Sequence, residues 1–256
     1  MGTHCNLWDT GILKQINGTK GELSMSMSRR SFVGSMGAGV AALGTLAAST
    51  PSADAQLIYM PTDWHMAEFD KLLKSKARVK QVFDVSNLAG GEFMSPIKNS
   101  INGLQFGFKI PVDQINVVAG LRGSANLLNF DDSMWEKYQL GDYTKTDDPK
   151  TGKPATRNLF YLKKEGTTTD VQDHNSVYQD YSVQALAPRG LTLLSCHNAT
   201  TNAAGRIIKK LGLKVEVEEV VKDLQSHMLP GVISVPAMVS AIAMLQCEGK
   251  FAYTTG

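Results

Sequence analysis

Residues 191–198, Leu191-Thr192-Leu193-Leu194-Ser195-Cys196-His197-Asn198, decide the fold because they join a buried strand to the start of a helix. The run from Leu191 to Ser195 is short and strongly apolar, which is typical of a strand covered on both faces. The breaker Pro188-Arg189-Gly190 precedes it, and helical spacing follows from Thr200 to Leu211. The stretch therefore predicts a strand of a parallel sheet with Cys196 at its carboxyl end.

The sequence on both sides of this stretch alternates between strand and helix patterns. Ser95-Pro96 is expected to cap one helix, whose apolar stripe is traced by Ile97, Ile101, Leu104 and Phe108. Alternation with short breakers predicts an α/β domain with parallel strands and helices on both faces of the sheet. The other predicted strands are 82–85, 114–120, 232–235 and 251–253, and the other predicted helices are 63–76, 218–224 and 236–246.

This alternation breaks at about residues 129–175, which we interpret as an insertion. A short helix is expected near Met134–Tyr138, and the polar tract Gly141–Asn158 is expected to be a long surface excursion. Loops of this length in a compact domain are usually functional or disordered, and the sequence does not choose between these alternatives. A helix near Ser176–Leu186 is expected to restore the regular pattern.

The N-terminal region has the order of an export signal. The segment Ser28-Arg29-Arg30-Ser31-Phe32-Val33-Gly34 is followed by an uncharged Gly/Ala-rich run and by the small-residue sequence Ala53-Asp54-Ala55. We therefore expect residues 1–55 to comprise an N-terminal extension and a twin-arginine signal peptide, with periplasmic localisation and no stable membrane anchor after processing. Residues 56–79 are predicted to form a helical segment before the α/β domain at 80–256. The alternative is a buried Gly/Ala helix of a cytosolic domain.

Composition excludes several classes of function. Without four basic and three acidic residues before Gln56, the totals of 26 and 24 fall to 22 and 21, so the mature chain is nearly neutral. With no basic strip interleaved with aromatic residues, nucleic acid is not an expected partner. No phosphate-binding glycine loop, dinucleotide fingerprint or nucleophile elbow is present, so no cofactor is predicted. The adjacent pair Cys196-His197 is the only close ligand spacing, and no metal is predicted.

Cys196 is the candidate for covalent chemistry. Sites in open parallel sheets form outside the carboxyl ends of the strands, and a helix N-terminus there would stabilise a thiolate, the nucleophilic form. His197 would act in the same direction or protonate a substrate, and Arg122, after the second strand, could bind an anion with a hydrogen bond from Ser124. Asn198 is a further candidate for substrate binding. Each of these residues also has a purely structural interpretation. Cys196 could be a small apolar core residue, and His197 could be a core histidine whose hydrogen bonds are made within the protein. Arg122 could be a surface charge, and Asn198 could be a helix N-cap.

Three groups of residues near the C-terminus resemble the DsrE-like (DsrE/DsrF-like) family. They are Arg189-Gly190-Leu191 leading into Leu194-Ser195-Cys196-His197-Asn198-Ala199, then Leu229-Pro230-Gly231-Val232 with Val235-Pro236-Ala237, and finally Leu245-Gln246-Cys247-Glu248-Gly249-Lys250-Phe251-Ala252-Tyr253. The resemblance covers about Lys80 to Tyr253 outside the insertion. It implies a three-layer α/β/α domain around a mainly parallel five-stranded sheet, assembly into homo-oligomers, and a cysteine that carries sulfur as a persulfide, matched here by Cys196. The export signal and the insertion depart from the family pattern.

Three functions are compatible with these features. The first is a periplasmic sulfur-handling protein, a persulfide carrier or sulfurtransferase that uses Cys196 and exchanges sulfur with a donor or acceptor protein. The second is a non-catalytic oligomeric module that binds a small ligand or a protein. The third is a redox protein that cycles Cys196 with Cys247, which requires Cα atoms within about 7 Å of each other.

Overall fold

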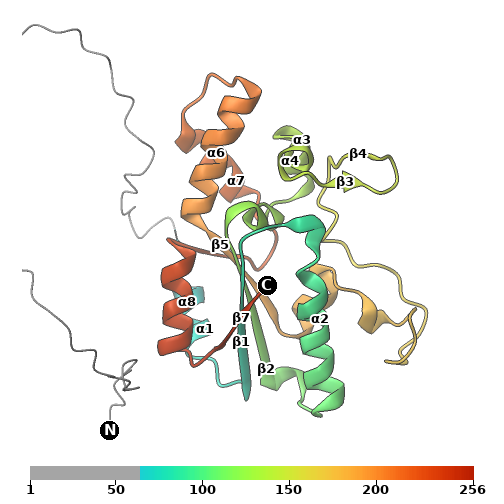
Figure 1. Ribbon diagram of the computed structural model, residues 1–256. Helices are drawn as coiled ribbons and strands as arrows, with labels where there is room; N and C mark the ends of the chain where they lie inside the picture. The colour runs from blue at the N-terminus through green and yellow to red at the C-terminus, as the bar shows by residue number, and fades with distance from the viewer. Residues whose placement is uncertain (1–63) are drawn as a thin grey trace, which may run out of the picture. The chain divides into compact units, whose positions relative to one another are not determined.

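The computed structural model describes residues 64–256 (Figure 1). The expected signal peptide, its cleavage site at Ala53-Asp54-Ala55 and the first residue of the helix predicted at 63–76 lie outside the described residues. The described chain is an α/β domain in which helices cover both faces of a central sheet.

The sheet contains five parallel strands in the order β6-β5-β2-β1-β7. This arrangement confirms the predicted three-layer architecture, and every strand falls within two or three residues of its expected position. The strands are β1 (Val79–Val85), β2 (Ile115–Leu121), β5 (Leu191–Cys196), β6 (Ile233–Val235) and β7 (Ala252–Thr255).

Alternation of side chains along each strand divides the core into two layers. The even-numbered residues Val82, Val118 and Leu194 pack beneath α1 (Met66–Leu73) and α8 (Met238–Cys247). The odd-numbered residues of β1, β2 and β5, such as Val117 and Leu193, face α2 (Met94–Asn102), α6 (His197–Leu211) and α7 (Val217–Ser226). Figure 1 shows α1 and α8 on one side of the strands and α2 on the other.

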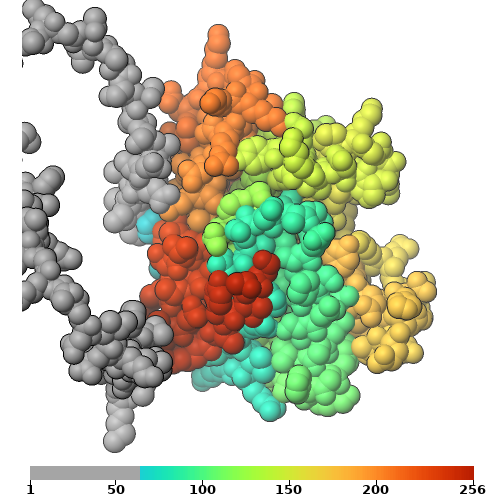
Figure 2. Space-filling view, viewed as in Figure 1, coloured from blue at the N-terminus to red at the C-terminus, as the bar shows by residue number. Residues whose placement is uncertain are grey.

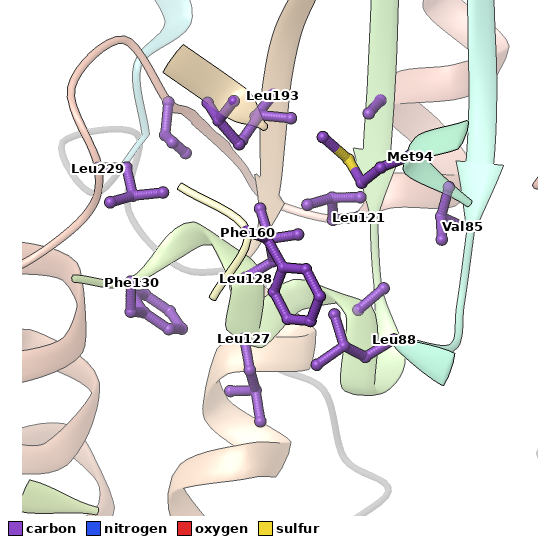
Figure 3. Close-up of a cluster of buried hydrophobic side chains, with 14 of the residues drawn as sticks. Val85, Leu88, Met94, Leu121, Leu127, Leu128, Phe130, Phe160, Leu193 and Leu229 are labelled. Carbon is purple, nitrogen blue, oxygen red and sulfur yellow. The ribbon is translucent and has the colours of Figure 1, made fainter. Parts of the chain in front are cut away.

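The insertion supplies part of the core rather than lying wholly on the surface. Its first helices are α3 (Asp132–Lys137) and α4 (Leu140–Thr144), followed by a two-stranded ribbon of β3 (Asp147–Asp148) and β4 (Lys153–Pro154). Phe160 lies in the middle of the apolar cluster, near Leu121 and Leu128 (Figure 3). The expected surface excursion Gly141–Asn158 is therefore wrong as a description of the whole tract, because Ala155 and Asn158 are both buried.

Several helix boundaries also differ from the sequence predictions. Ser95 lies inside α2, which begins one residue earlier, and Phe108 is exposed beyond the helix because a π-helical turn, η3 (Gly103–Gly107), ends the apolar stripe. The helix expected at Ser176–Leu186 is broken into a 3-10 turn, η6 (Val177–Gln179), and a single helical turn, α5 (Val183–Leu186). Another 3-10 turn, η7 (Ala187–Arg189), precedes β5. None of the helices within residues 64–256 combines the length and apolar character needed to cross a bilayer.

Candidate functional site

The topology opens a crevice at the carboxyl ends of β5 and β6. These neighbouring strands continue into helices on opposite faces of the sheet, because β5 leads into α6 and β6 leads into α8. Ligands of open α/β sheets bind at such a switch point, where the two connections diverge. Gly120 on β2 allows α8 to approach, since a Cβ atom there would lie 2.8 Å from the Met238 sulfur.

A cleft of about 640 Å³ occupies this crevice. In Figure 2 the surfaces of α6 in orange and α8 in red meet the light-green surface of the segment that follows β2. The cleft is lined by residues after three strands and by one residue of the insertion: Arg122, Gly123, Ser124, Tyr143, Cys196, Asn198, Ala199, Asn202, Ala203, Arg206, Ala237, Met238 and Val239. Four of the five site residues predicted from the sequence, Arg122, Ser124, Cys196 and Asn198, are therefore brought together.

Cys196 is the last residue of β5 and the N-cap of α6. Its side chain is on the α8 side of the sheet, packs among residues that include Val235 and Met238, and is 5 % exposed. It is a free thiol at the inner wall of the cleft. The helix begins three residues earlier than expected, so Asn198 lies in its first turn and the interpretation of Asn198 as an N-cap is wrong.

A buried ring of hydrogen bonds fixes the backbone of Cys196. The Cys196 amide donates to Asn126 Oδ1 at 2.8 Å, Asn126 Nδ2 donates to Thr200 Oγ1 at 2.9 Å, and that hydroxyl donates to the Cys196 carbonyl at 3.2 Å. Ser195 Oγ also donates to Asn126 Oδ1, at 3.2 Å. All of these residues are buried, so the ring is screened little by water and holds the cysteine firmly. Sequence reasoning missed Asn126 because its partners are some 70 residues away.

Arg122 is held in place by a carboxylate on the neighbouring strand. Its Nε and Nη2 atoms donate to the two oxygens of Asp84 at 2.7 and 3.2 Å, and the Tyr253 hydroxyl donates to the same carboxylate at 3.0 Å. The pKa of Arg122 is raised, chiefly by the hydrogen bonds to Asp84 and further by the negative charge of that carboxylate, which together outweigh the lowering effect of partial burial. The guanidinium is therefore a cation held in a fixed position on the cleft that Cys196 also lines.

The turn after β2 requires glycine at position 123. Gly123 has a φ of +55°, and a Cβ atom there would lie 2.3 Å from the Ser86 carbonyl oxygen. The turn places Ser124 on the cleft, where its hydroxyl donates to Asn87 Oδ1 at 3.1 Å and accepts from the Leu88 amide at the same distance. The Ser124 hydroxyl proton is therefore engaged by Asn87 and does not point to a ligand in this structure.

The first three turns of α6 present a polar face to the cleft. Asn198, Asn202 and Arg206 recur every four residues, so all three are on the same side of the helix. Arg206 is exposed and makes no ion pair within the part of the chain that the structure describes. The spacing from Asn198 was the signal that could have identified Arg206 from the sequence.

The charges and dipoles around the cleft favour an anion. Four ionisable side chains line the cleft: the guanidinium groups of Arg122 and Arg206, the Cys196 thiol and the Tyr143 phenol. No carboxylate is among the lining residues. Helices α6 and α8, of 15 and 10 residues, both begin at this cleft. The partial positive charge of each helix N-terminus adds positive potential there. The arrangement can therefore attract a small anion to the cleft wall that carries Cys196.

His197 is outside this group. Its side chain is not among those lining the cleft, is buried, and has Nδ1 3.0 Å from Gln225 Nε2 of α7. Direct neighbours at a strand-to-helix junction point in different directions, which separates the imidazole from the Cys196 thiol.

The insertion contributes Tyr143 to the cleft. This tyrosine is in α4, and α4 is linked to α6 by an ion pair between Asp142 and Lys210. No periodicity could have placed Tyr143 here, because the contact depends on how the insertion folds back over α6.

Among the residues that the structure describes, neither a metal centre nor a second thiol lies at the cleft beside Cys196. Within residues 64–256, no group of three or more His, Cys, Asp or Glu side chains is arranged to hold a metal ion. Cys247 is the last residue of α8, whereas the cleft is at the first residues of that helix, about 14 Å away at 1.5 Å per residue. This separation argues against direct cycling between Cys196 and Cys247.

Comparison of the chain with protein-family models, with curated proteins and with solved structures gave no match.

Proposed function

We propose that this protein binds a small sulfur oxyanion in the cleft and accepts its sulfane sulfur on Cys196. One observation carries the proposal: a cysteine at the carboxyl end of a central strand lies on a cleft whose charged side chains, Arg122 and Arg206, are both cations. The resemblance to the DsrE-like family supports the same chemistry. The reaction places the protein as a persulfide carrier or sulfurtransferase.

The chemical step follows from the groups on the cleft wall. The Cys196 thiolate attacks the outer sulfur of thiosulfate, the new S–S bond forms, and sulfite leaves with the electron pair of the broken S–S bond. The product is Cys196 persulfide, and total charge is conserved at −3. A second thiolate, on a small molecule or a partner protein, then takes the outer sulfur and regenerates Cys196.

The residues have distinct roles in this step. Arg122, fixed by Asp84, binds the sulfonate oxygens and stabilises the negative charge that collects on the leaving sulfite. Arg206 attracts the dianion, and Asn198 contributes an amide side chain at the helix N-terminus. Ser124 would donate to the anion only after exchanging its bond to Asn87. His197 is assigned no direct contact with the anion.

Intact-mass analysis of the full chain after incubation with thiosulfate tests this proposal. We expect one adduct of 32 Da on the wild type and on Cys247→Ser, and none on Cys196→Ser. Arg122→Gln should form the adduct more slowly at low thiosulfate. An equal adduct on Cys196→Ser, or none on the wild type, would contradict the proposal.

A binding function without sulfur transfer is the second candidate. The observation that favours it is the small exposure of Cys196, since most of the cleft wall is formed by other side chains. Thermal-shift measurements on Cys196→Ala with thiosulfate, sulfite and sulfate distinguish the two functions. Stabilisation that is unchanged without the thiol, together with no adduct on the wild type, favours binding alone.

We also propose periplasmic export and self-association. Export follows from Arg29 and Arg30, and replacement of both by lysine should retain the protein in the cytoplasm on cell fractionation. Self-association through α1 and α8 is supported by the exposed side chains Met66, Val239 and Met244. Sedimentation of the wild type should give an oligomer that Val239→Glu weakens, and a monomeric wild type would contradict this.

A further inference from the structure

A second cleft, of about 570 Å³, lies in the insertion and shares no residue with the cleft at Cys196. It is formed by the chain on both sides of β3, from Lys145 to Lys150, and by residues between Arg157 and Lys164. Gly90 and Tyr181, from outside the insertion, complete its wall. In Figure 2 this segment, yellow to light orange, is on the flank of the domain opposite α8. Nothing in the proposed sulfur chemistry uses this surface.

Positive charge dominates the second cleft. It is lined by five cations, Lys145, Lys150, Arg157, Lys163 and Lys164, and by one carboxylate, Asp147. Asp148 is just behind the wall and is already engaged, because it accepts from the Lys150 amide at 2.9 Å and from Arg157 Nε at 3.1 Å. These interactions hold the pKa of Asp148 below its usual range, and the hydrogen bond from the Lys150 amide has the largest effect. Two further carboxylates accept from backbone amides of the cleft wall, Asp132 from Asn158 at 2.8 Å and Asp180 from Lys164 at 2.6 Å. When all four carboxylates are counted against the five cations, an excess of one positive charge remains, and Asp147 is the only carboxylate among the lining residues.

The backbone that carries these side chains is firmly anchored. Asn158 is buried and its Nδ2 donates to the carbonyls of Leu128 and Phe130, each at 2.8 Å. Phe160 is inserted into the main apolar core (Figure 3). The Lys163 amide donates to Gln184 Oε1 at 3.0 Å. The hollow is therefore a feature of the folded domain and not a gap between loose loops.

The chemistry of the cations selects the ligand. The guanidinium fork of Arg157, which suits carboxylates and phosphates alike, is occupied by Asp148, so ligand binding depends on the lysines. The lysines that remain are compact point charges, which bind the tetrahedral oxygens of phosphate or sulfate without a planar constraint. Lys164 is packed over the Tyr181 ring at 4.1 Å from its centroid, so one ammonium is already held at the cleft. We propose that this cleft binds a small, multiply charged anion that carries phosphate or sulfate groups.

Isothermal titration of the full chain with tripolyphosphate and, separately, with sucrose octasulfate tests the proposal and distinguishes phosphate from sulfate. We expect saturable binding of at least one probe that weakens as salt increases. Lys150→Gln/Lys163→Gln should raise its Kd roughly tenfold, since two close charges are lost. The control is Lys71→Gln/Lys74→Gln, which makes the same change in net charge on two exposed lysines, one in α1 and one at its C-cap, and should bind as the wild type does.

Three outcomes would overturn the proposal. The first is that neither probe binds, and the second is an equal loss of affinity in the control variant. The third is tighter binding of citrate than of both probes, which would indicate a carboxylate site. Because no lysine of this cleft contacts Cys196, Lys150→Gln/Lys163→Gln should still form the thiosulfate adduct. The two proposals can therefore fail separately.

Discussion

The buried ring around Cys196 makes a prediction about stability that can be worked out from its contacts. Asn126→Ala removes the acceptor of the Cys196 amide, and both residues are at most 5 % exposed. A buried donor left without a partner costs about 1–3 kcal/mol, and the lost bonds to Thr200 and Ser195 cost about 1 kcal/mol more. We expect a total loss of about 3 kcal/mol in the free energy of unfolding.

Urea unfolding of the full chain, followed by circular dichroism, measures this loss. With a denaturant slope of about 2–3 kcal/mol per molar urea, the midpoint should fall by about 1 M. Ser195→Ala is the matched control, because it removes one donor to Asn126 but leaves the Cys196 amide bonded, and it should cost about 1 kcal/mol. An Asn126→Ala midpoint no lower than that of Ser195→Ala would refute the reasoning.

Three further predictions concern the turn, the insertion and acid stability. Gly123→Ala should displace the turn, because its Cβ would meet the Ser86 carbonyl, and should weaken thiosulfate binding measured by thermal shift. Phe160→Ala should destabilise the domain by about 3–4 kcal/mol in urea unfolding, since a buried ring is lost from the core. Partial burial raises the pKa of Asp223, but hydrogen bonds, notably from Lys137, outweigh it and hold the pKa below its usual range. Its contribution is therefore present above the unfolded pKa of about 3.9 and is lost as pH falls through the folded value, so Asp223→Asn should destabilise the protein at pH 7 and the difference from the wild type should shrink in acid.

The sequence predicts the sheet well because each strand carries its own local signal. The apolar run at 191–195 and the run at 115–120 are bounded by breakers, and both are strands of the sheet in the structure. The candidate site is predicted in part for the same reason, since Arg122 directly follows β2, Cys196 is the last residue of β5, and these two strands pair in parallel. The carboxyl ends of such strands share an edge whatever the intervening chain does.

The remainder of the site depends on tertiary contacts that leave no local pattern. Asn126 and Asp84 act through partners far away in the sequence, and Tyr143 reaches the cleft only because the insertion folds against α6. The tract Gly141–Asn158 has the sequence pattern of a surface excursion because its buried residues, such as Ala155 and Asn158, are spaced irregularly among polar ones. Irregular segments of this kind are buried by individual hydrogen bonds and not by a periodic face.

The central claim is that Cys196 reacts within an anion-attracting cleft, and its rates of alkylation by iodoacetate and iodoacetamide test this most directly. The two reagents differ in charge, so the ratio of their rates at Cys196 reports the local potential. We predict that Arg122→Gln/Arg206→Gln lowers the iodoacetate-to-iodoacetamide ratio by about fivefold, equivalent to about 1 kcal/mol for the lost charges. An unchanged ratio in this variant, or a Cys196 that neither reagent modifies in the folded wild type, would contradict the account.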